Sequence, residues 1–402
     1  MPGTPSITRR DLLRGAAAGA LGAVAAGSVA AASGCSSDTA DVDVLDVSED
    51  DVVTLDSFKE LSSSAGRVDV DDLCTLNGGT ILGGTGSAVC AAILASDTAN
   101  PLNRLALLGL QSGRVSTVRQ RAVGHKKGFE FLSARASNNM IVWVESNFLT
   151  SEWRVYCAGV RQKALSIHNV VLLDSGDADW DAPAIEAVGN TVFWIVQPSE
   201  DGQKTTEDSH LKASAAGASP VVVHTSHGRF CGGLCASGGV VTAMPRVDTS
   251  GVYYQLTAFE STSGSVISSQ VMPASFRPQA AVFMDGKFSF TIGASYDYGG
   301  GISEVGTYFP LDDGTWLRLV KQPYFAPGIA GGWLFSKSGA RTVLVDLDNR
   351  AYLTVDAPEG SADWGDCPIC IGKSRRVFVF ATVDDDSSYT STKVRVRAIT
   401  PR

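Results

Sequence analysis

Four carboxylates are the residues of this 402-residue chain whose types and positions best suit acid–base chemistry. A pair of carboxylates can act as general acid and general base on one bond, as in glycoside hydrolysis. Ser209 and His210 lie beside two of them, but neighbours on a strand point to opposite faces, and no Gly-x-Ser-x-Gly elbow exists. We therefore expect no nucleophilic triad. The candidate catalytic residues are Asp181, Glu207, Asp208 and Asp366.

Aromatic and charged residues alternate in the loops that contain these acids. Flat aromatic faces beside carboxylates and guanidinium groups suit a sugar, a peptide or a protein loop. The same residues can instead have structural roles, since a Trp before a strand often packs in the core and an Asp often accepts from turn amides. The candidate ligand-binding rim comprises Lys127, Trp180, His227, Arg229, Arg246, Arg277, Tyr296, Tyr298, Tyr324 and Trp364.

Metal and redox sites receive little support from the cysteines and acidic runs. Cys367-Pro368-Ile369-Cys370 looks like a redox motif but falls on a predicted strand, where residues three apart lie ~10 Å apart, too far for a disulfide. We expect mostly reduced, buried thiols. Asp177, Asp179 and Asp181 resemble half of a calcium loop but lack its glycine and closing glutamate. We predict no cofactor and no metal, with calcium left as an option.

The N-terminal residues have the layout of an export signal. Paired Arg9 and Arg10 precede leucines and an apolar Ala/Gly/Val stretch that ends before Cys35. This resembles the twin-arginine (Tat) signal S/T-R-R-x-[FL]-L-K, and residues 32–35 (Ala-Ser-Gly-Cys) resemble a lipobox. The resemblance implies cleavage before Cys35, lipidation of its sulfur and anchoring in the cell membrane on the extracytoplasmic side. A spanning helix and cleavage after residues 30–32 are the alternatives.

A repeat must position the candidate residues, because similar segments start at 80, 132, 183, 231, 278, 327 and 368. Intervals of 41 to 52 residues match a four-stranded propeller blade. Prolines at 183, 278, 327 and 368 favour an edge strand at a channel. We predict an all-β, seven-bladed propeller, with six blades as the alternative. An N-terminal outer strand, Val52–Leu55, is expected to complete the last blade.

The run Pro183-Ala-Ile-Glu-Ala-Val-Gly-Asn-Thr-Val-Phe-Trp194 resembles the repeat of TolB-like propellers, although most units lack its Ser-Pro-Asp-Gly. The closest family resemblance is to Tat-exported bacterial lipoproteins with such a propeller. The chain then divides into a signal peptide (1–34), a flexible tether (35–51) and the propeller (52–402).

Composition limits the partners. A net charge of −9 disfavours nucleic acid, and 44% hydrophobic residues suffice for a large core. With no catalytic signature, the first hypothesis is a membrane-anchored, non-catalytic recognition or scaffold module. It would bind a protein or an envelope polysaccharide at the channel mouth. The alternative is a glycan-cleaving or other hydrolytic propeller that uses the loop carboxylates.

Overall fold

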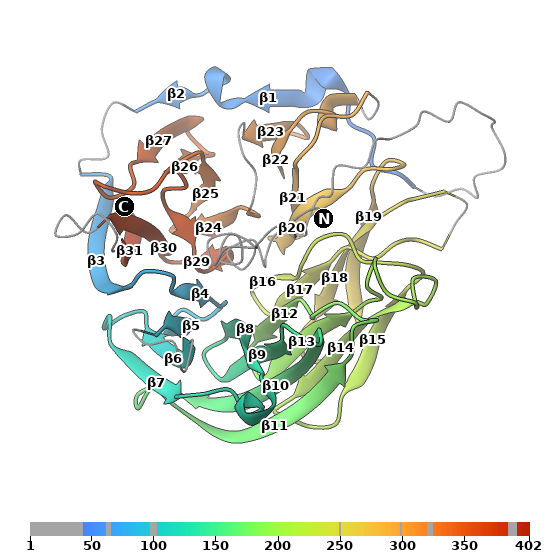
Figure 1. Ribbon diagram of the computed structural model, residues 1–402. Helices are drawn as coiled ribbons and strands as arrows, with labels where there is room; N and C mark the ends of the chain where they lie inside the picture. Colours follow the sequence, from blue (N-terminus) through green and yellow to red (C-terminus); the bar gives the residue numbers. More distant parts are fainter. Residues whose placement is uncertain are drawn as a thin grey trace, which may run out of the picture.

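The computed structural model describes residues 43–61, 66–96, 103–248, 251–297, 300–319, 325–384 and 392–402. Within these residues the strands form seven sheets that surround a common centre (Figure 1). The all-β propeller prediction is confirmed. No helix in the described part is long and apolar enough to cross a bilayer. The signal segment, with Arg9, Arg10 and Cys35, lies outside the described residues.

The first four sheets, blades 1 to 4, are antiparallel meanders in chain order. Their strands are, for blade 1, β4 (Ile81–Gly83), β5 (Val89–Ala95), β6 (Asn103–Gly109) and β7 (Val115–Arg119); for blade 2, β8 (Glu130–Ala136), β9 (Met140–Asn147), β10 (Glu152–Arg161) and β11 (Ser166–Gly176); for blade 3, β12 (Ile185–Val188), β13 (Thr191–Val196), β14 (Ser209–Ala215) and β15 (Val221–Ser226); and for blade 4, β16 (Cys235–Ser237), β17 (Val240–Ala243), β18 (Gln255–Glu260) and β19 (Val266–Val271).

The remaining three sheets also take strands from the N-terminal segment. Their strands are, for blade 5, β20 (Pro278–Met284), β21 (Lys287–Ile292), β22 (Gly306–Pro310), β23 (Trp316–Leu319) and β1 (Val52–Thr54); for blade 6, β24 (Gly328–Ala330), β25 (Trp333–Ser338), β26 (Arg341–Asp346), β27 (Ala351–Val355) and β2 (Lys59–Glu60); and for blade 7, β28 (Cys367–Pro368), β30 (Val377–Asp384), β31 (Thr392–Pro401) and β3 (Val68–Asn77). Four short 3-10 turns are η1 (Glu49–Asp51), η2 (Leu55–Ser57), η3 (His125–Lys127) and η4 (Gly300–Ile302).

The chain segment that follows the innermost strand of blade 7 pairs with blade 6. After β28, the chain forms β29 (Gly372–Ser374), which pairs in parallel with β24 of blade 6. Counted by sheets the ring has seven blades, and counted with blades 6 and 7 as one joined unit it has six. β29 also reaches blade 4, because the Lys373 amide donates to Ser237 Oγ at 2.9 Å. Gly372 is required there, since its φ is +90° and a Cβ would lie 2.5 Å from that of Ser237.

Apolar packing closes the ring. The buried side chains form seven clusters, and each joins two neighbouring blades. Trp143 of blade 2, for example, packs with Leu105 of blade 1, and Ile369 of blade 7 packs with Leu108 of blade 1. The alternating strands explain this pattern, because both faces of an inner blade strand are covered by adjacent blades.

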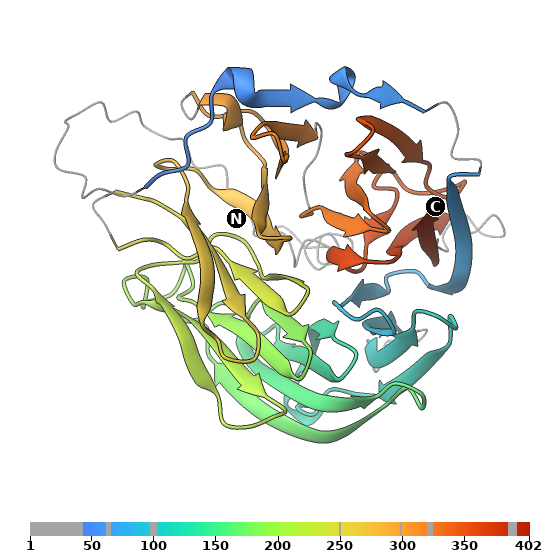
Figure 2. The same cartoon turned by 180° about the vertical axis from the view of Figure 1, so that it is seen from behind.

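The chain ends meet in blade 7, as the sequence predicts, but through a different strand. β3 pairs antiparallel with β31 over most of its length, so it is the outer strand of the last blade. Residues 52–54, the predicted closing strand, instead pair in parallel with β23 of blade 5. In Figures 1 and 2, β1 and β2 run along the outer edges of blades 5 and 6 before β3 enters blade 7.

Part of the predicted tether belongs to the N-terminal segment that follows the outside of the ring, residues 43–60, which we call the perimeter path. The Leu45 amide donates to Val271 O of β19 at 2.8 Å, and Val44 forms a parallel bridge with Val271. Val47 is buried in the cluster between blades 4 and 5. The acidic composition of residues 43–51 suggests a solvated linker, but the three apolar side chains among them dock on the ring. Residues 35–42 lie outside the described part.

Candidate functional site

A cavity of about 310 Å³ opens between β10 and β11 of blade 2 and the middle strands of blade 3. It lies where β10 begins, β11 and β13 end and β14 begins, so all four strand ends face the same end of the ring. Several of its side chains are aromatic or ionisable, which suits a polar ligand with an apolar face. The lining residues are Trp153, Asp174, Ser175, Trp180, Val196, Glu207, His210 and Lys212.

Asp174 is the most heavily hydrogen-bonded residue of the cavity. One carboxylate oxygen accepts from Lys212 Nζ and from Trp194 Nε1, each at 2.8 Å. The other accepts from the Ser175 amide at 3.0 Å. Lys212 and Asp174 are mostly shielded, with side chains 25% and 19% exposed. The Lys212 ammonium and the Trp194 indole N–H hold this carboxylate in one orientation.

Glu207 is the second carboxylate of the cavity, and its surroundings differ from those of Asp174. Its backbone amide donates to Lys204 O at 2.9 Å, which fixes the loop. Its side chain is exposed and has no hydrogen bond or ion pair with any described residue. The cavity therefore combines one carboxylate that is fixed by an ion pair with one that is exposed to solvent.

Two tryptophans build the apolar wall. Trp153 is fully buried, and its Nε1 donates to Trp180 O at 2.9 Å. Gly176 makes room for it, since a Cβ there would lie 2.4 Å from the Trp153 ring. Trp180 is half-buried, and Lys204 Nζ lies 5.1 Å from its ring centre in a cation–π contact. Trp180 thus contacts Trp153 and Lys204 and also lines the cavity.

The loop that contains Trp180 is fastened to the long loop before β14. Gln203 N donates to Asp179 Oδ1 at 3.0 Å, and Asp179 N donates to Asp177 Oδ1 at 3.1 Å. These carboxylates hold turns together, which is the structural role expected for acids in such loops. In the described residues, no group of three His, Cys, Asp or Glu side chains could hold a metal ion. The calcium half-loop is thus not assembled there.

The predicted rim residues of blades 3 and 4 do come together. Arg229 Nη2 contacts Asp181 Oδ2 at 2.6 Å, and its Nε contacts Glu200 Oε1 at 3.4 Å. His227 lies between Asp208 (3.4 Å) and Asp248 (3.7 Å). These ion pairs tie blade 4 to the loops of blade 3. Asp181 and Asp208 therefore act as partners of basic side chains here.

None of the other predicted rim residues that the structure describes lines this cavity. Arg246 donates to Gly251 O at 3.2 Å. The Arg277 amide donates to the Tyr296 hydroxyl at 3.0 Å, and the Tyr296 ring stacks on Phe276 with centres 4.2 Å apart. Lys127 is exposed in η3, where its carbonyl accepts from Asn147. Tyr298 and Tyr324 lie outside the described residues.

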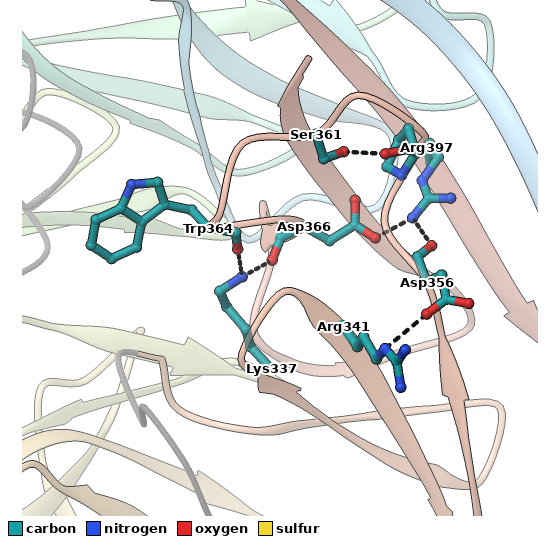
Figure 3. Close-up of polar contacts among 8 residues, drawn as sticks. Lys337, Arg341, Asp356, Ser361, Trp364, Asp366 and Arg397 are labelled. Carbon is teal, nitrogen blue, oxygen red and sulfur yellow. Dashed lines mark hydrogen bonds and ion pairs between the residues drawn. The ribbon is translucent and has the colours of Figure 1, made fainter. Parts of the chain in front are cut away.

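Asp366 is not a free rim acid, which corrects its candidate role. It is 1% exposed and forms an ion pair with Arg397 of β31 (Figure 3). Burial raises the pKa of Asp366, and the Arg397 charge partly offsets this effect. Lys337 Nζ donates to the carbonyls of Asp366 and Trp364, and the Trp364 ring points away from this cluster. Trp364 itself is 56% exposed.

The seven described cysteines are all free thiols. Burial raises the pKa of Cys231, Cys235 and Cys370 to about 12. Cys370 Sγ donates to Gly86 O at 3.3 Å, so the second cysteine of the Cys-Pro-x-Cys run is a core residue. Thiols in such surroundings are poor nucleophiles and poor metal ligands.

Sequence reasoning missed Trp153, Asp174, His210 and Lys212 as members of this cavity. Asp174 directly follows the apolar run Val170–Leu173, a pattern that indicates the end of a strand and could have marked it as a candidate site residue. Its partner Lys212 lies 38 residues away on another blade, and only the three-dimensional packing reveals the pair.

No family model matches the chain, and no curated protein matches it. Solved structures share the fold. A structure from a study of two prolyl endopeptidases has a TM-score of 0.51 at 13% identity, covering 77% of this chain and 45% of that one. A Pyrococcus horikoshii acylaminoacyl peptidase (0.46, 12%, 76% and 51%) and an oligogalacturonate lyase with manganese (0.49, 8%, 84% and 98%) are also similar. The chain spans about half the length of the two peptidases.

These comparisons contradict the hypothesis of a non-catalytic recognition or scaffold module. The structure from the study of two prolyl endopeptidases, with a TM-score of 0.51, comes from an enzyme that shares the fold, so the hydrolytic alternative replaces that hypothesis. Identities of 8 to 13% show the fold alone, however. The chemistry must therefore be argued from the residues of this chain.

Proposed function

We propose that this propeller is a hydrolase that cleaves a glycosidic bond in the cavity between blades 2 and 3. The observation that carries the proposal is the pair of carboxylates on one cavity, Asp174 and Glu207, in contrasting surroundings. Glycoside hydrolysis needs one carboxyl group that donates a proton and one that remains charged. The half-buried Trp180 supports a sugar substrate, because sugar rings present C–H faces to indole rings.

Each carboxylate has a separate role in this mechanism. Glu207, exposed and without a partner among the described residues, donates a proton to the leaving oxygen as the glycosidic C–O bond breaks. A water molecule then adds to the sugar carbon, and its proton returns to Glu207. Asp174, held by Lys212 and Trp194, stabilises the positive charge that develops at the sugar carbon. His210 and Lys212 supply donors for the substrate hydroxyls.

Release of new reducing ends from a panel of neutral, amino and acidic oligosaccharides tests this function. Glu207→Gln and Asp174→Asn should each lower kcat at least ~100-fold, the range expected for an acid–base group. Glu200→Gln is the matched control, because Glu200 is a nearby exposed acid paired with Arg229 outside the cavity. Unchanged turnover in Glu207→Gln, or no cleavage of any sugar by the native chain, would refute the assignment.

We also propose that the chain is exported by the Tat route and anchored through a lipid on Cys35. The support is the Arg9-Arg10 pair and the Ala-Ser-Gly-Cys run before the described residues. An extracytoplasmic location would bring the cavity to envelope polysaccharide. Cys35→Ala should release the chain from the membrane fraction, and Arg9→Lys with Arg10→Lys should block export. Retention of the Cys35→Ala chain on the membrane would contradict the anchor.

A further inference from the structure

Long stretches of the outer edges of blades 2 to 4 lack charged side chains. Residues 164–173, 213–226 and 261–275 contain no Asp, Glu, Lys or Arg, although 19% of the chain is charged. The segments include β15, most of β11 and all of β19, the outermost strands of their blades. Edge strands usually carry charges, because an uncharged edge attracts other surfaces. We call these three segments the uncharged edge.

Apolar side chains on this edge are open to solvent. Six of them are 40 to 60% exposed, which is high for Val, Leu and Ile. They are Val170 and Leu172 on β11, Val221 and Val222 on β15, and Val266 and Ile267 on β19.

The three blades present these residues as one surface. The turn of blade 3 packs on blade 2, since a Cβ at Gly217 would lie 3.3 Å from Val171. The turn of blade 4 packs on blade 3 in the same way, since a Cβ at Gly264 would lie 3.4 Å from the Val223 side chain. Figure 1 shows β11, β15 and β19 following one another along the outside of the ring.

The edges of blades 5 to 7 differ, because the chain covers them itself. β1 covers β23, β2 covers β27 and β3 covers β31. The covering begins at blade 4, where Val44 bridges Val271 at the end of β19. Going round the ring from blade 5 to blade 4, the N-terminal segment covers the edges only as far as Val271. The uncharged edge continues from there through blades 4, 3 and 2.

We propose that the uncharged edge is a membrane-contacting surface that lies against the lipid bilayer. The proposal rests on the anchor at Cys35 put forward above. Eight residues lie between Cys35 and Val44, and the nine residue-to-residue steps span at most ~32 Å. Val44 is paired with Val271, so an anchored Cys35 holds the bilayer within that distance of the end of β19, the strand that contains Val266 and Ile267. Uncharged apolar side chains enter a bilayer interface favourably, whereas the acidic remainder of the surface does not.

Hydrogen exchange of the full, lipidated chain tests this surface. The chain is bound to vesicles of phosphatidylethanolamine and phosphatidylglycerol (3:1) and compared with the Cys35→Ala chain in buffer. Peptides 213–226 and 261–271 should exchange at least tenfold more slowly on vesicles. Peptides that contain β23 and β27, whose edges are already covered, should not change.

A double variant, Val222→Glu with Ile267→Glu, should remain lipidated yet lose this protection. Leu149→Glu is the matched control, because Leu149 is 95% exposed but lies in the β9–β10 turn away from the edge. Urea unfolding of both variants checks that they fold. Loss of protection in the Leu149→Glu chain would overturn the proposal.

The mass of the Cys35 peptide separates failure of the anchor from failure of the edge. A lipidated Cys35 without slower exchange leaves the anchor standing and refutes the membrane contact. An unmodified Cys35 refutes the anchor, and the edge proposal with it. Equal protection in concentrated protein without vesicles would show that a second copy covers the edge, which also overturns the proposal.

Discussion

Glu186 of β12 gives the sharpest test of the electrostatics in the ring. Its side chain is 3% exposed, and its only hydrogen bond within the described residues is from the adjacent Ala187 amide at 2.9 Å. Burial raises its pKa from 4.5 to about 7, although Arg135 lowers it in part. Glu145 of β9 is equally buried, but its carboxylate accepts from the amides of Val123 and Gly124 and from Trp143 Nε1.

The sign of the pH effect follows from proton binding. Native Glu186 keeps its proton up to about pH 7, whereas the unfolded chain loses it near pH 4.5. The free energy of unfolding therefore falls as pH rises from 4.5 to 7, and the full loss is present above pH 7. A shift of about 2.5 pH units corresponds to ~3 kcal/mol at 1.36 kcal/mol per unit. Glu186→Gln is neutral at every pH, so it removes this loss.

Urea unfolding of the native chain and of Glu186→Gln at pH 4.5, 6, 7 and 8 measures the effect. The variant should gain stability relative to the native chain by ~3 kcal/mol between pH 4.5 and 8. Glu145→Gln is the control, and it should be destabilised by about 2 kcal/mol even at pH 8, because its amide group opposes N–H donors. A stability difference between Glu186→Gln and the native chain that is constant across this pH range would refute the reasoning.

Three further predictions concern the closure, the thiols and the buried lysine. Ile399→Ala in β31 should cost 2–5 kcal/mol in urea unfolding, because Ile399 is fully buried between blades 6 and 7; a cost under 0.5 kcal/mol would contradict that packing. An aromatic disulfide reagent at pH 8 should label the native chain slowly but all seven described thiols in denaturant, since burial raises their pKa values; fast labelling of Cys235 or Cys370 would be the contrary result. Lys337→Met should destabilise the chain by about 2 kcal/mol, because two carbonyls lose their donor; a neutral effect would show that these bonds are dispensable.

The repeat was predictable because each blade has its own local signals. Pro278 and Pro368 do lie on inner strands, and the Gly189-Asn190 turn does join β12 to β13, where the backbone of Gly189 has a φ of +56°. Such turns depend on neighbouring residues alone, so a sequence reveals them.

The closing strand could not be chosen in this way. Residues 52–55 are a short, mostly apolar run, whereas β3 is a ten-residue strand with three aspartates, and the choice between them depends on which edge each reaches. The perimeter path places residues 52–54 at blade 5, so the antiparallel edge of β31 is left for β3.

The site residues were less predictable than the fold for the same reason. Asp366 looks like a loop acid until Arg397, 31 residues later, is found against it. Asp174 looks like a strand end until Lys212 and Trp194 of the next blade enclose it. Contacts between blades decide whether a carboxylate is buried, paired or available.

The perimeter path has a mechanical consequence. A pulling force applied to the chain before residue 43 acts first on the bridge at Val44, then on β1 and then on β2. Each attachment must peel away before tension reaches β3, where the two ends of the ring are joined. The short parallel strands therefore bear the pulling force before it reaches the pairing of β3 with β31.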